Sequence, residues 1–201
     1  MKESSRQLQK QRTRDMLLHT AYLYFSEHGI RNTRMSDIAQ AAGVSHGTVF
    51  LHFKTQEELI AEVVGTCCGK IARRTHELAG ECGSLEEMLK AHLDGIREYE
   101  AFYTRLVVES RMLPQSARDA WISVQSAVSL HLSPFLEKAV AEAGLSGTPA
   151  SMLFHVWMGL IHYYLANSDL FAPDGKVVER YGDAWISTFL QLLRQRPEKL
   201  S

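Results

Sequence analysis

The stretch of residues 33–54 constrains this chain more than any other, because it predicts two short helices separated by a tight turn. Thr33 is expected to cap the first helix, and Asp37 lies in its first turn, where a carboxylate suits the positive end of the helix dipole. Gly43 can take the left-handed backbone that ends a helix. Ser45 is then placed to cap the second helix. The two helices therefore cross within a few residues.

The second helix of this pair is expected to bury only two side chains. Val49 and Phe53 are four residues apart, so they share one face and can anchor the helix to a core. The other side chains point elsewhere: His46, Gly47, Thr48, Phe50, Leu51 and His52. Short, mixed polar and apolar groups suit a surface that presses against another molecule. The motif that fits is the helix-turn-helix, whose second helix enters the major groove of DNA.

Several segments of this region together resemble the N-terminal signature of the tetracycline-repressor (TetR) family of transcriptional regulators. They are Asp37-Ile38-Ala39, Ala42-Gly43-Val44-Ser45, Gly47-Thr48, His52-Phe53-Lys54 and Glu57-Glu58-Leu59. The similarity covers approximately residues 10–60, and beyond it only length and helical pattern are shared. The alternative is an ordinary helical hairpin in a core, because a bare helix-turn-helix pattern has many false matches.

Helical periodicity and capping signals continue through the rest of the chain, without strand-like alternation. We therefore predict an all-α fold of about nine helices. The resemblance implies an N-terminal three-helix DNA-binding domain, residues 1–54, and a C-terminal helical domain for ligand binding and dimerisation, residues 55–201. The first helix is expected over approximately residues 9–28. Pro134 is expected to kink or split a helix over approximately residues 115–143.

Basic charge is concentrated at the N-terminal end of the chain. Residues 1–54 carry a net charge of +4 and the remainder −5, within a total of −1. This distribution is expected when one part of a chain faces a polyanion. Residues 1–9, which include Lys2 and Arg6, are expected to form a flexible arm that contacts phosphates or the minor groove. The alternative is a solvated basic tail.

The predicted DNA-binding residues all lie in or beside the helix-turn-helix. They are Thr33, Arg34, Ser36, Ser45, His46, Gly47, Thr48, Phe50, Leu51, His52 and Lys54. The resemblance implies that Thr48, His52 and Lys54 contact the phosphate backbone. The partner is therefore expected to be double-stranded DNA.

Five of these side chains are candidates for contacts with bases. Leu51, Phe50 and the methyl group of Thr48 can meet thymine methyl groups, while His46 and Ser36 can hydrogen-bond to base edges. Two positions depart from the pattern of the family that the chain resembles. Phe50 stands where tyrosine is common, so a hydroxyl contact is lost. His46 stands where lysine is frequent, so full positive charge is present only at acidic pH.

The C-terminal half is expected to hold a cavity for a small-molecule effector between its helices. The candidate lining residues are His92, Tyr99, Tyr103, Trp121, His131, His155, Met158 and His162. Each of them can equally belong to a core.

The last two helices, expected over approximately residues 149–168 and 175–194, carry more large apolar groups than one core face needs. With their symmetry copies they would form a four-helix contact in a homodimer, as the resemblance also implies. The candidates for this contact are Phe154, Trp157, Ile161, Tyr164, Tyr181, Trp185, Phe189 and Leu192. The alternative is a helix pair sunk into a monomeric core.

The sequence lacks a nucleophile elbow, a Walker loop, an HExxH motif and a catalytic carboxylate pair. We therefore expect no enzyme activity, no catalytic residues, no metal site and no cofactor. Cys67, Cys68 and Cys82 have neither zinc-site spacing nor an even disulfide framework, so reduced thiols in a cytoplasmic protein are expected. No run approaches the roughly 18 apolar residues of a membrane span.

The leading hypothesis is a ligand-responsive transcriptional repressor that binds an inverted-repeat operator as a homodimer and is released by a small molecule. One alternative is a helical small-molecule carrier, or an enzyme, with an incidental helix-turn-helix. Another is a regulator that senses redox state through the adjacent thiols of Cys67 and Cys68.

Overall fold

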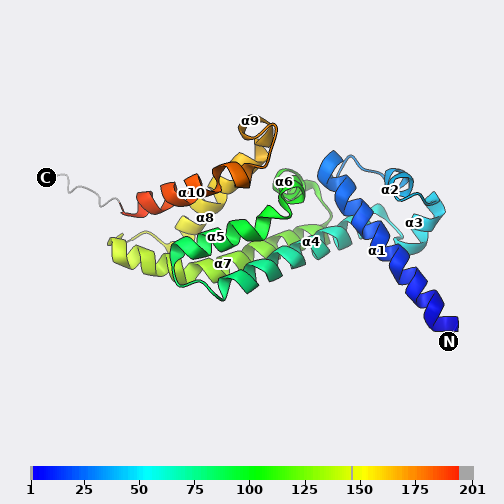
Figure 1. Cartoon of the computed structure of the whole chain (residues 1–201), viewed down its shortest axis with the longest axis horizontal. Coiled ribbons are helices and arrows are strands. Elements are labelled where there is room, and N and C mark those ends of the chain that lie inside the picture. The colour runs from blue at the N-terminus through cyan, green and yellow to red at the C-terminus, as the bar shows by residue number, and fades with distance from the viewer. Residues whose placement is uncertain (1, 146, 195–201) are drawn as a thin grey trace. The chain divides into compact units, whose positions relative to one another are not determined.

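The computed structural model describes residues 2–145 and 147–194, which form ten α-helices and one 3-10 helix (Figure 1). The elements are α1 (Lys2–His28), α2 (Met35–Ala41), α3 (His46–His52), α4 (Gln56–Ala79), α5 (Leu85–Arg97), α6 (Glu100–Glu109), η1 (Ser110–Met112), α7 (Gln115–Ala143), α8 (Ala150–Ala166), α9 (Ser168–Phe171) and α10 (Val177–Arg194). The predicted all-α fold is confirmed. Within the described ranges, no helix has the length and apolar character needed to cross a membrane.

The internal contacts divide the chain into two units. Unit 1 comprises Met1–Cys68 and Ala101–Trp121, and unit 2 comprises Gly69–Glu100 and Ile122–Ser201. Helices α4 and α7 each contribute residues to both units. The domain boundary predicted after Lys54 separates DNA binding from ligand binding. The two contact units do not test this division of function, so the boundary stays a prediction.

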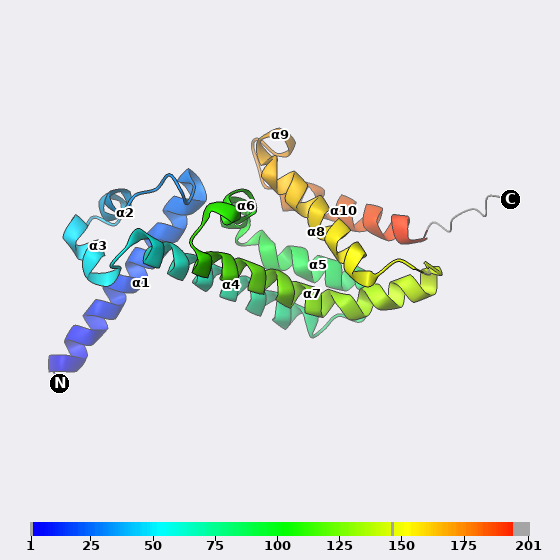
Figure 2. The same ribbon diagram turned by 180° about the vertical axis from the view of Figure 1, so that it is seen from behind.

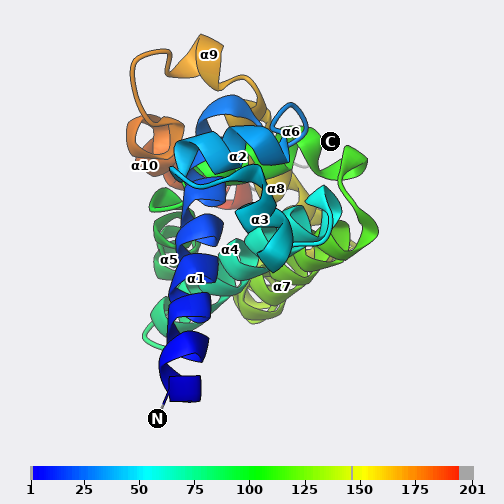
Figure 3. The same ribbon diagram turned by 90° about the vertical axis from the view of Figure 1, so that its right-hand side faces the viewer.

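Unit 1 is built on one buried face of α1, next to which α2 and α3 lie (Figure 3). Leu17, Ala21 and Phe25 recur at four-residue steps on that face, and each is at most 1% exposed. Ile38 of α2 and Val49 of α3 are also fully buried. The helix-turn-helix is therefore held by an apolar core, which leaves its opposite side to solvent.

Helix α1 begins at Lys2, so the flexible arm expected over residues 1–9 is wrong for the described residues 2–9. Met1 lies outside them. The physical reason is that this segment has no glycine or proline and is rich in residues with good helix propensity, so the helix continues without a core to pack on.

Helix α6 holds the C-terminal end of α1 by hydrogen bonds of two opposite kinds. The guanidinium of Arg105 donates to the carbonyls of Ser26 and Glu27, at 3.2 and 2.6 Å. The Glu109 carboxylate accepts from the backbone N–H groups of Ile30 and Arg31, the latter at 2.8 Å. Orphan carbonyls and the amides that follow them are thus both satisfied by one helix.

Unit 2 packs α10 against both α5 and α8 (Figures 1 and 2). A Cβ atom on Gly182 would lie 3.2 Å from Leu93 Cδ1, so the glycine lets α10 approach α5 closely. The buried Glu100 carboxylate accepts hydrogen bonds from the N–H groups of Val177 and Val178, at 2.6 and 3.2 Å. These bonds tie the first turn of α10 to the start of α6.

Pro134 was expected to kink or split its helix, and α7 runs through it without a break, so the helix is not split. Proline removes only the hydrogen bond to the carbonyl of Leu130, and both residues are exposed, so that water can satisfy the carbonyl. One residue earlier, the Ser133 hydroxyl donates to the Ser129 carbonyl at 2.8 Å.

Candidate nucleic-acid interface

The first helix of the motif is capped differently from the prediction. Arg34, not Thr33, is the N-cap residue of α2, and its backbone N–H donates to the Asp37 carboxylate at 2.7 Å. Thr33 is 2% exposed, and its hydroxyl donates to the Gly29 carbonyl at 2.7 Å. The predicted contact of the Thr33 side chain with DNA is therefore wrong, because the hydroxyl closes the turn after α1.

The turn between α2 and α3 has the predicted geometry. Gly43 has a φ of +66°, in the left-handed region that favours glycine. The Val44 N–H donates to the Ala39 carbonyl at 3.0 Å, which closes the end of α2. The Ser45 hydroxyl accepts from the Thr48 N–H at 3.1 Å and so caps α3.

Helix α3 buries the two predicted anchors and exposes most of its other residues. Val49 and Phe53 are both 0% exposed, whereas Leu51 is 69% exposed. His46 and Phe50 are exposed as well, and their rings contact each other edge to face with centroids 4.8 Å apart. An exposed leucine beside an aromatic pair, on a short helix held by two buried side chains, forms a surface that suits a binding partner.

Arg14 of α1 is a residue that the sequence did not single out. Its guanidinium donates to the His52 carbonyl at 2.6 Å, forms an ion pair with Glu62 of α4, and lies 4.3 Å from the ring centre of Phe53. Arg14 therefore holds the C-terminal end of α3 between α1 and α4. Charge alone could not have found this role, because Arg12 nearby is exposed.

His52 lies half-buried at the end of α3. Burial, together with the positive charges of Lys10 and Arg14, lowers the pKa of its imidazole. The ring is therefore neutral at pH 7 in the free protein. Its Nδ1 atom is buried and has no hydrogen-bond partner among the described residues. Lys10 and Arg14 both belong to α1, so this helix places positive charge near the same end of α3.

Lys54, Ser36 and Arg34 are exposed, as predicted DNA contacts must be. The backbone N–H of Lys54 donates to the Glu58 carboxylate at 2.6 Å, and the Thr55 hydroxyl accepts from the Glu58 N–H. The Lys54 amide is therefore already satisfied, and only its ammonium group is left for a phosphate. Ser45, Gly47 and Thr48 complete the predicted set at the start of α3, with the Thr48 hydroxyl 2.8 Å from that of Ser45.

The predicted effector-binding residues are divided between the two units. Tyr103 and Trp121 lie in unit 1, both buried, with ring centroids 4.9 Å apart. The others belong to unit 2: Tyr99 and His162 are half-buried, Met158 is buried, His155 is exposed, and His131 faces His76. His92 is fully buried and belongs to the core.

His92 makes one hydrogen bond and leaves one nitrogen without a partner. The indole N–H of Trp157 donates to His92 Nδ1 at 3.0 Å. Burial lowers the pKa of His92 to about 3, so the ring is neutral and its single proton is on Nε2. Neither this N–H nor the indole N–H of Trp185 has an acceptor within the described part of the chain. Unit 2 therefore holds two buried donors that have no acceptor among the described residues.

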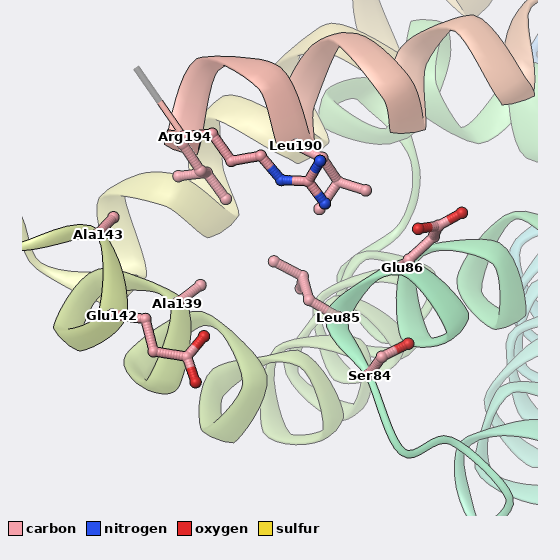
Figure 4. Close-up of a pocket in the computed structure, with 9 residues that line it drawn as sticks. Ser84, Leu85, Glu86, Ala139, Glu142, Ala143, Leu190 and Arg194 are labelled. Carbon is pink, nitrogen blue, oxygen red and sulfur yellow. The ribbon is translucent and has the colours of Figure 1, made fainter. Parts of the chain in front are cut away.

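A cavity of about 380 Å³ opens between the ends of three helices of unit 2 (Figure 4). Its lining combines leucines with charged groups, and Figure 4 shows Leu85, Leu190 and Arg194 directed into the space between α5, α7 and α10. None of the eight predicted effector residues lines it. The sequence offered no signal for it, since its residues come from three helix ends.

Most of the predicted dimer residues are buried within the protomer. Phe154, Trp157, Ile161, Trp185 and Phe189 are each at most 7% exposed. A buried side chain offers no surface to a second copy, so their assignment to a dimer contact is wrong. Broad apolar coverage of these helices instead reflects the packing of α8 against α10 and α5.

The remaining three residues differ from one another. Tyr164 and Tyr181 are half-buried in unit 2, where their aromatic rings contact each other. Tyr164 also stacks on Phe171, with the ring centroids 4.1 Å apart. Leu192 alone is exposed, at 58%.

The adjacent thiols of α4 are unsuited to redox sensing. Cys67 and Cys68 are each 3% exposed, and burial raises the pKa of Cys68 to about 12. The thiolate is the reactive form of cysteine, so a thiol that stays protonated at neutral pH reacts slowly. The redox alternative therefore has no support in the structure.

The fold and the exposed helix α3 define a helix-turn-helix protein. The family model described as "Bacterial regulatory proteins, tetR family" matches residues 17–63. That range contains the whole of α2 and α3. The chain belongs to the TetR family of transcriptional regulators.

Curated relatives agree with this assignment. The "Probable acrEF/envCD operon repressor" of Escherichia coli (strain K12) is 30% identical over 91 residues, which cover 45% of this chain and 34% of that protein. The match thus spans about a third of that relative. The "HTH-type transcriptional regulator TtgR" of Pseudomonas putida is 22% identical over 93% of this chain and 94% of its own length.

Solved structures share the fold over nearly the full length. A TetR family transcriptional regulator from Agrobacterium tumefaciens has a TM-score of 0.73 and 18% identity, over 91% of this chain and 98% of its own. The transcriptional regulator FadR from Bacillus subtilis, solved in complex with stearoyl-CoA, has a TM-score of 0.64 and 18% identity, over the same shares of the two chains.

Proposed function

We propose that this chain is a transcriptional repressor that binds an inverted-repeat operator through α3 as a homodimer, and that a small molecule releases it. The observation that carries the proposal is the state of α3. This helix is capped by Ser45, anchored by Val49 and Phe53, and exposes the side chains that can reach into a groove. Repressors are among the relatives of the chain.

Base recognition is assigned to the exposed side of α3. Leu51 and Phe50 are the apolar groups for thymine methyls, and His46 is the polar group for a base edge. Gly47 adds no side chain, so the backbone can approach the duplex closely.

Phosphate binding is assigned to the cations around α3. Lys10 of α1, Arg34 before α2 and Lys54 after α3 are all exposed. Phosphates near His52 would favour its protonated form, because negative charge raises the pKa of an imidazole. The net charge of +4 over residues 1–54 supports this assignment. Chromosomal DNA as the partner also implies a cytoplasmic location.

The test is a mobility-shift titration with DNA from upstream of the gene, comparing the wild type with H46E. The new carboxylate lies on the exposed face of α3 and repels the phosphates, so we expect affinity to fall at least about tenfold with an unchanged unfolding midpoint. His19→Glu is the matched control, since His19 is an exposed histidine of α1 outside the motif. Equal loss in both variants would reject the role of α3.

The homodimer is proposed to form through the exposed face of α8. Met152, Val156 and Tyr163 recur at steps of four and seven residues and are 55%, 48% and 59% exposed. Leu192 of α10 is the predicted residue that remains available. Isologous pairing of this face would bury apolar groups that otherwise contact water.

The effector is proposed to bind in the C-terminal domain, residues 55–201, and to satisfy the buried donors of unit 2. His92 Nε2 and Trp185 Nε1 both lack acceptors, so a molecule that enters the core of unit 2 with a carbonyl or carboxylate group on an apolar body would satisfy either donor. A solved structure with the same fold, FadR from Bacillus subtilis, binds stearoyl-CoA. Long-chain acyl-CoA is therefore the first compound to add to the DNA complex, and release is the expected result.

A further inference from the structure

Two histidines of unit 2 face each other across α4 and α7, and neither belongs to the DNA-binding surface. His76 Nδ1 lies 3.2 Å from His131 Nε2, with ring centroids 5.1 Å apart. The two residues are 55 positions apart in the sequence, and helices α4 and α7 run side by side where they meet (Figures 1 and 2). His76 is exposed and His131 half-buried, so the pair can be reached from solvent.

We propose that His76 and His131 form a two-histidine chelate for a divalent transition-metal ion of the zinc, copper or nickel class. Imidazole nitrogens suit these ions. With metal–nitrogen bonds of about 2.0–2.1 Å, two ligand nitrogens on one ion lie about 2.8–3.4 Å apart in square-planar or tetrahedral geometry. The observed 3.2 Å separation lies within this range, so chelation requires the two rings to turn toward a common point but leaves the distance between their nitrogens unchanged.

The ion would replace the hydrogen bond between the two rings and would lie beside the line that joins the two nitrogens. In the neutral pair one facing nitrogen donates and the other accepts. Metal binding needs a lone pair on both, so the donor ring moves its proton to its other nitrogen, and no proton is gained or lost.

The neighbouring side chains determine how many protein ligands the ion would have. No group of three or more metal-ligating side chains occurs anywhere in residues 2–145 and 147–194, so water would complete the coordination shell. The nearest carboxylate along α4, that of Glu77, forms an exposed ion pair with the guanidinium of Arg74 at 3.7 Å. An open, two-ligand site favours reversible binding, and it would link α4 to α7.

The experiment is calorimetric titration of untagged wild-type protein, H76Q and H131Q with ZnCl₂ at pH 7.5. We expect one ion per chain for the wild type and an affinity lower by roughly tenfold or more in each variant, because one imidazole alone gives no chelate. His19→Gln, the substitution of a lone exposed histidine, should bind as the wild type does. Both site residues reach solvent, so circular dichroism should report an unchanged fold.

Nuclear magnetic resonance gives the second measurement. One equivalent of Zn²⁺ should shift the imidazole C–H signals of His76 and His131 together, and leave those of His19 in place. Zinc affinity that survives unchanged in either variant would overturn the proposal, as would the absence of binding by the wild type. DNA plays no part in these measurements, so their outcome is independent of the proposed repressor function.

Discussion

Arg14 joins three elements of unit 1 through one guanidinium group and so helps to hold α3 in place. It donates to the His52 carbonyl, pairs with Glu62 and lies over the Phe53 ring. The ion pair itself contributes modestly, because its side chains are 25% and 32% exposed. The hydrogen bond from a charged group to the end of α3 contributes more.

We predict that Arg14→Met destabilises the protein and weakens its DNA binding. The loss should be about 1–3 kcal/mol in the free energy of unfolding, from the charged hydrogen bond and the ring contact. Urea denaturation measures the stability, and fluorescence anisotropy with labelled DNA measures the affinity. Arg12→Met removes the same charge from an exposed position. It should change stability by less than about 0.5 kcal/mol, and an equal loss in the two variants would contradict the role of Arg14.

The buried His92 predicts how stability depends on acidity. Its pKa is about 3 in the folded protein and near 6.5 when unfolded. Between these values the unfolded chain binds a proton that the folded chain does not. Its contribution to stability is therefore complete above about pH 6.5 and is lost as the pH falls toward 3. His162, whose pKa burial lowers to about 4, adds to the same trend.

The H92Q variant should lose stability more slowly on acidification than the wild type. The slopes should differ by up to about 1.4 kcal/mol per pH unit between pH 6 and pH 4.5, which corresponds to one proton. Denaturant unfolding at a series of pH values measures this. The exposed His155→Gln is the matched control and should keep the wild-type slope. Parallel curves for H92Q and the wild type would show that His92 does not resist protonation.

At the scale of elements, the turn between α2 and α3 depends on the left-handed backbone of Gly43. Nothing lies within 4 Å of a Cβ built there, so an alanine would meet no clash and would pay only for its positive φ. Gly43→Ala should therefore cost about 1–2 kcal/mol of stability and lower DNA affinity.

Gly69 of α4 provides the matched comparison for Gly43→Ala. It is also free of neighbours within 4 Å but has helical geometry. Alanine has the higher helix propensity, so Gly69→Ala should stabilise the protein by up to about 1 kcal/mol. Thermal unfolding of both variants measures the difference. A destabilisation of the same size at the two positions would mean that backbone conformation does not explain the effect.

The elements that the sequence predicts well are those with local signals. Gly43 and Ser45 punctuate the motif, and the spacing of Val49 and Phe53 identified the anchors, because caps and periodicity act within a few residues. The flexible arm was wrong because residues 2–9 have good helix propensity and continue α1 without a core to pack on. Of the two outcomes expected at Pro134, a kink or a split, the split does not occur, because water can satisfy the one carbonyl that loses its hydrogen bond.

The site residues that the sequence missed depend on contacts between distant segments. Arg14 meets His52 across 38 residues, and His76 meets His131 across 55. The buried dimer candidates failed because apolar coverage of a helix does not reveal which side its own core takes. Tertiary packing decides this: Trp157 lies against Phe189 at 5.3 Å within the protomer, while Val156 beside it remains exposed.

The proposed homodimer is a property of the whole assembly, and a charge placed on the exposed apolar face of α8 tests it. Val156→Asp puts a charge in the centre of the exposed apolar face, so it should convert the dimer to a monomer and reduce operator affinity. Sedimentation equilibrium gives the mass. Ser151→Asp adds the same charge to an exposed position about 140° around the helix and should remain dimeric. A dimer that persists in V156D would mean that another surface joins the two copies.

Helix α3 is proposed to lie in the major groove of DNA. Methylation protection tests this placement directly, because dimethyl sulfate modifies guanine N7, an acceptor in that groove. The wild type should protect guanines in two half-sites spaced by about one helical turn or somewhat more, and H46E should lose both protected regions at the same concentration. A specific complex that leaves guanine N7 open in both half-sites, or that keeps its protection in H46E, would contradict the claim.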